Sequence, residues 1–129
     1  MLRDRLLRLR LGQRGERLAA RLLKSKGYRI AATNVRFPVG EIDVIAWEGE
    51  MLCFIEVRVA SSDRWGGAAA SIGVRKQQRM IRAAHWYLTR FGATPPRTRF
   101  DVVAIDWQPR TLPVVQLIPG ALETSEAGW

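Results

Sequence analysis

Apolar and polar residues alternate along this chain with two periods, one typical of helices and one typical of strands. Residues 15–26 repeat their apolar positions every three to four residues and end before Gly27, where a left-handed residue is tolerated, so we expect a helix. A second helical pattern covers residues 74–91. Its apolar stripe contains Met80, Ile81, Ala84, Leu88 and Phe91. Strand patterns cover residues 28–36, 40–46, 52–59, 99–107 and 114–118.

This order of elements predicts an α/β protein, an α/β/α sandwich with a central mixed sheet. A hairpin lies within the sheet, and the second helix crosses over to a parallel strand. The 129 residues fit a single domain spanning residues 1–129. We expect residues 1–11 to form a basic arm or helix, and residues 120–129 to form a tail that frays.

The strongest functional clue is a group of ionisable residues in the two middle strands. Glu48-Gly49-Glu50 is a natural tight turn between them. If Gly49-Glu50 is the two-residue loop, Asp43 lies directly opposite Glu56, and Glu41 lies opposite Arg58. Strand alternation then gives the other face an entirely apolar set. That set is Ile42, Val44, Ala46, Cys53, Ile55, Val57 and Val59.

Two carboxylates that face each other under a covering layer repel and lose hydration. A divalent cation or a nearby basic group can offset that cost. Mg²⁺ prefers oxygen ligands and keeps several waters, so two or three carboxylates are enough to hold it. An ion-pair cluster of Asp43, Glu56 and Arg58 at an exposed strand end explains the pattern equally well. Strand geometry leaves both interpretations open.

Residues elsewhere in the chain could join this cluster. Glu16 lies at the edge of the first helix's apolar arc, as a first-turn acid or as a third carboxylate. Gln77 lies within the stripe of the second helix with Lys76 beside it, so this helix start either contributes polar groups or is simply solvated. Arg64 and Trp65 lie in a glycine-containing loop, where the ring can stack on a base or pack on the core.

Composition narrows the choice of partners. Lys and Arg number 21 against 12 Asp and Glu, and the net charge of +9 favours a polyanionic partner, nucleic acid first, with a plainly solvated basic surface as the alternative. The lone Cys53 lies in an apolar strand and is expected in the core, which agrees with a reducing, cytoplasmic setting. No apolar run approaches the roughly 18 residues that cross a bilayer, so we expect no membrane partner.

Five motifs together resemble the YraN-like family of uncharacterised bacterial proteins, over about residues 12–122. That family looks like a branch of the restriction-endonuclease-like, PD-(D/E)xK superfamily and is similar in layout to archaeal Holliday-junction resolvases. The motifs are Glu16, Gly40-Glu41-Ile42-Asp43, Phe54-Ile55-Glu56-Val57-Arg58, Lys76-Gln77 and Arg99-Phe100-Asp101-Val102-Val103.

The resemblance implies a restriction-endonuclease-like fold, DNA as the substrate and a homodimer. It also implies that Glu16, Asp43 and Glu56 bind Mg²⁺ or Mn²⁺ and that position 58 holds a catalytic lysine. Here position 58 is Arg, whose guanidinium stays protonated and prefers planar, two-pronged contacts. Arg58 can therefore stabilise charge on a phosphate but does not readily accept a proton. Lys76 is a candidate for the missing ammonium.

Three functions follow from these observations. The first is a metal-dependent nuclease acting on DNA or branched DNA, with Glu16, Asp43, Glu56 and Arg58 as its catalytic set. The second is a catalytically silent nucleic-acid-binding module, in which Arg58 pairs with Glu56 and no metal enters. The third is a protein-interaction domain whose basic surface meets an acidic partner.

Overall fold

The computed structural model describes residues 2–60, 72–107 and 112–122, with side chains for residues 12–59 and for the two later ranges. Its elements follow the predicted order. They are α1 (Leu2–Ser25), β1 (Arg29–Phe37), β2 (Gly40–Glu48), β3 (Met51–Ala60), α2 (Val74–Leu88), the 3₁₀ turn η2 (Thr89–Phe91), β4 (Thr98–Asp106) and β5 (Val114–Ile118).

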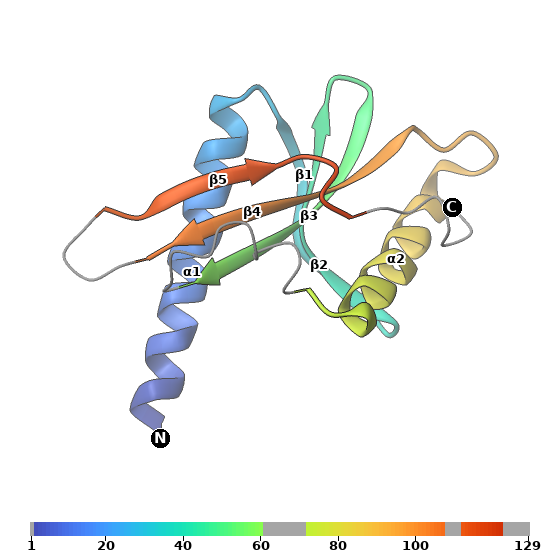
Figure 1. Ribbon diagram of the computed structural model, residues 1–129. Helices are drawn as coiled ribbons and strands as arrows, with labels where there is room; N and C mark the ends of the chain where they lie inside the picture. The colour runs from blue at the N-terminus through green and yellow to red at the C-terminus, as the bar shows by residue number, and fades with distance from the viewer. Residues whose placement is uncertain (1, 61–71, 108–111, 123–129) are drawn as a thin grey trace.

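The five strands form one mixed sheet in the order β1-β2-β3-β4-β5 (Figure 1). Neighbouring strands are antiparallel except β3 and β4, which run parallel. Parallel neighbours need a crossover connection, and α2 lies in the connection between them. The predicted α/β class and mixed sheet are therefore confirmed.

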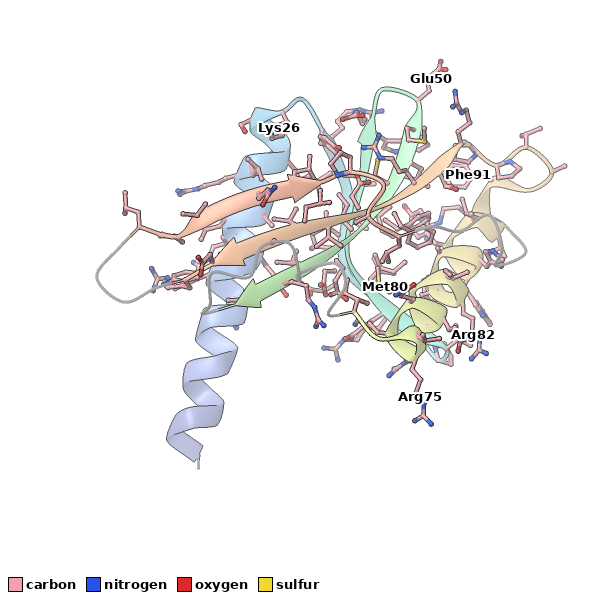
Figure 2. All side chains as sticks on the ribbon, viewed as in Figure 1. Lys26, Glu50, Arg75, Met80, Arg82 and Phe91 are labelled. Atoms are coloured by element: carbon pink, nitrogen blue, oxygen red, sulfur yellow. The ribbon has the colours of Figure 1, made fainter. Side chains whose placement is uncertain are left out.

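The two helices cover opposite faces of the sheet (Figure 1). On the α2 face, Met80 points toward the sheet (Figure 2), and Phe54 stacks on Phe100 with ring centroids 5.4 Å apart. On the α1 face, Ala19 and Leu23 are fully buried against the other side of the sheet. Each face of the central strands thus has its own apolar core, which explains why these strands are apolar on both sides.

The helices differ from their predicted bounds, α1 at both ends and α2 at its C-terminal end; α1 ends at Ser25, one residue before the predicted Lys26. α1 begins at Leu2, so the basic segment that we expected as an arm or a helix continues the first helix. α2 ends at Leu88, and the last predicted turn forms the 3₁₀ helix η2. Tyr87, absent from the predicted stripe, is buried and forms a T-shaped ring pair with Phe54, with ring centroids 6.1 Å apart.

The hairpin has the predicted turn. Gly49, with φ of +58°, and Glu50 join β2 to β3, and Glu48 pairs with Met51. Glycine adopts this left-handed conformation without steric cost. The paired register runs to Val44 opposite Ile55, as the sequence predicts.

The C-terminal tail is described as far as Leu122, which is buried. The backbone N–H of Gly120 donates a hydrogen bond of 2.8 Å to the Asp101 carboxylate, so the first residues of the expected tail pack against the domain. Residues 123–129 lie outside the described part of the chain. Within that part, no helix combines the length and apolarity needed to cross a membrane.

Candidate active site

The candidate site begins where the pairing of β2 with β3 ends. The paired register stops at Val44 and Ile55, before Asp43 and Glu56 pair as backbone neighbours. Instead, the Asp43 carboxylate accepts a hydrogen bond of 2.9 Å from the backbone N–H of Val57. A side-chain oxygen therefore satisfies a β3 amide, and the Asp43 side chain is held toward β3.

A change of face in β2 explains this orientation. Ile42 packs in the α2-side core and Val44 in the α1-side core, although residues two apart in a regular strand share a face. The prediction that Ile42 shares the face of Val44 is therefore wrong. The strand departs from regular alternation at Asp43, between the two apolar residues.

The neighbouring strand β1 changes face at the matching place. Ala32 and Val35 both pack on the α2-side core, although they are three residues apart. Between them, Asn34 has φ of +50°, a left-handed conformation that asparagine tolerates better than most residues. The sequence analysis missed Asn34, and an asparagine within a strand pattern was the available signal.

Glu56 is the buried acid of the site, with 5% of its surface exposed. Its Oε2 atom lies 3.2 Å from Lys76 Nζ but receives no well-aligned hydrogen bond from any described residue. Burial and the adjacent Asp43 carboxyl raise the pKa of Glu56 to about 8, against the opposing effect of Lys76. Asp43 and Glu56 are thus brought together, and near pH 7 Glu56 tends to hold a proton.

Lys76 reaches this pair from the first turn of α2. A Cβ atom at Gly40 would lie only 2.5 Å from the backbone oxygen of Arg79, so glycine allows α2 to lie directly against the start of β2. Lys76 Nζ also lies 3.9 Å from Glu41, whose other ion-pair partner is Arg36 at 3.5 Å. Helix packing therefore places an ammonium beside the carboxylates, which the sequence alone left open.

Gln77 has a structural contact in the same turn. Its Nε2 donates a hydrogen bond of 2.9 Å to the backbone oxygen of Ile72, just before α2 begins. The side chain is partly buried, so it is not simply solvated. A nucleic-acid contact of Gln77 stays a prediction.

Glu16 approaches the site from α1. It accepts a hydrogen bond of 3.3 Å from Asn34 Nδ2 and lines the same hollow as Asp43. In the described ranges, no three histidine, cysteine, aspartate or glutamate side chains are grouped closely enough to hold a metal ion. The structure thus brings Asp43 and Glu56 together and places Glu16 in the adjoining hollow. The three acids therefore do not form one compact ligand set.

The remaining predicted residues are placed less directly. Arg58 is half-buried in β3 two positions after Glu56, and regular pairing of β3 with β4 extends through both. Alternation therefore assigns Glu56 and Arg58 to one face. Arg64 and Trp65 lie outside the described residues.

Comparison with known proteins settles the family. The sequence model that describes the uncharacterised protein family UPF0102 matches residues 15–105. The chain belongs to the UPF0102 family. A UPF0102 protein of Symbiobacterium thermophilum is 46% identical over 97 residues, covering 75% of this chain and 82% of that protein. A UPF0102 protein of Desulfosudis oleivorans is 40% identical over 120 residues, covering 93% of this chain and 95% of that protein. A UPF0102 protein of Moorella thermoacetica is 47% identical over 116 residues, covering 88% of this chain and 96% of that protein.

The UPF0102 chain also has a buried charge network on the other face of the sheet. Asp101 is fully buried and accepts hydrogen bonds from Arg99 Nε at 2.8 Å, Arg99 Nη2 at 2.9 Å and Gly120 N at 2.8 Å. The Arg99 guanidinium also donates a hydrogen bond of 2.7 Å to the Tyr28 hydroxyl. Because these bonds link α1's end, β4 and the tail, the Arg99 to Val103 motif serves the fold.

Cys53 lies near that network in the UPF0102 fold. Its side chain is fully buried, as predicted, and burial together with the Asp101 charge raises the pKa of the thiol to about 12. The thiol therefore stays protonated near neutral pH, and a protonated thiol is a poor nucleophile. Cys53 fills core space.

Proposed function

We propose that this protein binds nucleic acid and hydrolyses phosphodiester bonds with Mg²⁺ or Mn²⁺. The observation that carries the proposal is the position of the Lys76 ammonium, 3.2 Å from Glu56 and beside the Asp43–Glu56 pair. The PD-(D/E)xK pattern expects an ammonium from position 58, where this chain has Arg. In the proposed site, Lys76 supplies that ammonium from α2.

The donor set suits a hard divalent cation. Asp43 and Glu56 offer neighbouring carboxylate oxygens, and the buried Oε2 atom of Glu56 receives no well-aligned hydrogen bond from the described residues, although Lys76 Nζ lies 3.2 Å away. Glu16, which lines the same hollow as Asp43, would ligate the cation or orient water. A bound cation would supply charge neutralisation at the phosphate and a lowered pKa for the attacking water.

The basic residues would act on the phosphate directly. Lys76 presents a compact positive charge that can contact a non-bridging phosphate oxygen, and its ion pairs with Glu56 and Glu41 hold it at the site. Arg58 would add a second, permanently charged group suited to two-pronged contacts. The net charge of +9 agrees with a polyanionic substrate.

We favour DNA, including branched DNA, and a homodimer because of the likeness to Holliday-junction resolvases.

A catalytically silent nucleic-acid-binding module is the second candidate. Lys76 already lies 3.2 Å from the buried Glu56 carboxyl without a metal, and the described residues contain no compact set of three metal-binding side chains. This alternative predicts binding that weakens steeply with salt, and no cleavage with any divalent cation.

The test is incubation with labelled four-way-junction, duplex and single-stranded DNA in Mg²⁺ or Mn²⁺. Glu56→Gln and Lys76→Ala should each abolish cleavage, whereas Glu50→Gln, which changes an exposed carboxylate at the hairpin tip (Figure 2), should retain it. Binding without cleavage by the unaltered protein would favour the silent module. If Arg58→Lys then restored cleavage, the arginine at position 58 would be the cause of the missing activity.

Binding no tighter than that of a generic basic protein would instead favour the protein-interaction domain. A cleavage activity that survives both Glu56→Gln and Lys76→Ala would contradict the assigned site.

A further inference from the structure

A second hollow lies along α1, and we call it the arginine hollow. The described residues that line it are Arg14, Arg17, Leu18, Arg21, Trp107 and Pro113. Positions 14, 17 and 21 are three and four residues apart, so their side chains share one face of the helix. The Arg14 guanidinium lies over the Trp107 ring, 4.6 Å from its centroid, and this stack joins the helix to the end of β4.

The charge of the arginine hollow is uncompensated within the described part of the chain. Its lining contains three arginines and no acid. Arg17 and Arg21 are exposed, and neither forms an ion pair with a described acidic side chain. Guanidinium groups held close together repel one another, and each matches a phosphate in two-pronged geometry. A phosphate-bearing ligand would relieve that repulsion.

The spacing of the arginines suits a nucleic-acid backbone. At about 1.5 Å per residue, positions 14 to 21 span about 10 Å of helix axis. Each strand of duplex DNA places a phosphate about every 3.4 Å along the duplex axis, so a helix that lies along this axis has about three phosphates of one strand within its length. Repeated single negative charges therefore complement the row better than one isolated anion does.

Arg17 connects this hollow to the candidate active site. It lines the arginine hollow and also the hollow that contains Glu16 and Asp43. On the helix, Glu16 and Arg21 point in different directions, and Arg17 lies between them at 100° per residue. A strand that crosses Arg17 would therefore pass from the arginines directly to the carboxylates.

We infer that the arginine hollow binds the phosphate backbone of the nucleic-acid strand that flanks the scissile bond, with Arg17 as the link to the carboxylates. This inference rests on the proposed function and adds where the substrate lies. Its ligand is a run of nucleic-acid phosphates.

Fluorescence anisotropy with labelled single-stranded and duplex DNA, in EDTA and over a series of salt concentrations, tests the inference without cleavage. The test variant is Arg17→Gln with Arg21→Gln. The matched control is Arg75→Gln with Arg82→Gln, which removes the same charge from exposed residues of α2 that point away from the sheet (Figure 2). Thermal unfolding of both double variants checks that they fold.

The α1 double variant should bind DNA at least about tenfold more weakly than the unaltered protein. The magnitude of the slope of log K against log salt should fall by about two, because each lost phosphate contact removes about one unit. The control should change both quantities much less. Equal losses in the two variants, or undiminished binding by the α1 variant, would overturn the inference and leave the proposed function standing. Absence of binding by the unaltered protein would overturn both.

Discussion

Glu56 shows how one residue's surroundings govern the site at the residue scale. Its carboxyl is enclosed beside Asp43, with Lys76 as the compensating cation. Desolvation and the like-charged neighbour favour the protonated form, and the ammonium favours the charged form. The first two effects prevail, so Glu56 tends to hold a proton that a cation could replace.

Glu56→Gln should change how stability depends on pH. An unfolded glutamate titrates near 4.5, and the folded Glu56 near 8, so between these values the folded state holds a proton that the unfolded state has released. Wild-type stability should therefore fall as pH rises through this window, and the variant should lack that loss. Unfolding temperatures measured in EDTA would show it.

The control for this experiment is Glu50→Gln, which changes an exposed acid in the hairpin turn. Its pH profile should match that of the wild type. If the Glu56→Gln and wild-type slopes are the same, the raised pKa of Glu56 is wrong.

At the element scale, the contact of α2 with β2 determines whether the ammonium reaches the acids. Gly40 packs against the backbone of Arg79, one turn after Lys76. Any side chain at position 40 must push the helix and strand apart, because a backbone carbonyl cannot rotate away as a side chain can. The glycine in the Gly40-Glu41-Ile42-Asp43 motif thus has a packing reason.

Gly40→Ala should destabilise the protein by about 1–3 kcal/mol, as over-packed cores do. It should also weaken the Lys76–Glu56 ion pair. Gly73→Ala is the matched control at the start of the same helix, where an added Cβ meets nothing within 4 Å. Urea unfolding would compare them, and equal effects of the two substitutions would contradict this role of Gly40.

Asp101 also acts at the element scale, because its side chain joins β4 to the C-terminal turn on the face of the sheet opposite Glu56. Asp101→Asn removes the charge that Arg99 pairs with in a fully buried position. Breaking one partner of a buried ion pair typically costs about 3–5 kcal/mol. Denaturant unfolding should show a loss of this size in the free energy of unfolding, with the proposed DNA binding retained by the folded fraction. A loss below about 1 kcal/mol would mean that the network is dispensable.

At the scale of the whole molecule, α1 separates two hollows of different charge. One contains the carboxylates Glu16 and Asp43, and the other contains arginines without acids among its described lining. A polyanion is attracted to the second and needs a cation to approach the first. This division gives the net charge of +9 a direction across the surface.

Divalent cations should stabilise the whole fold if the carboxylates bind them. A ligand that binds only the folded state adds about 2.7 kcal/mol at one hundred times its dissociation constant. Thermal unfolding in Mn²⁺ or Mg²⁺ should therefore show a rise in the unfolding temperature that Asp43→Asn abolishes and Glu50→Gln retains. A rise that persists in Asp43→Asn would place the cation elsewhere.

The sequence by itself determined the elements and the hairpin. Alternation and helical periods depend on a residue's near neighbours, so they predicted the strand at Val114–Ile118 with its observed bounds and the order of all the elements. The Gly49-Glu50 turn fixed the register of β2 and β3 as far as Val44, because turn length sets the pairing. That register also brought Asp43 and Glu56 to the same end of the hairpin.

Only the tertiary structure decided what meets those carboxylates. The irregularity at Asn34 and Asp43, the approach of Lys76 over Gly40 and the buried bonds of Asp101 all join residues that local patterns do not connect. Their geometry depends on how deeply each helix packs on the sheet, which is a property of the assembled core. A sequence period predicts which face a side chain occupies, whereas helix packing decides which charge it meets there.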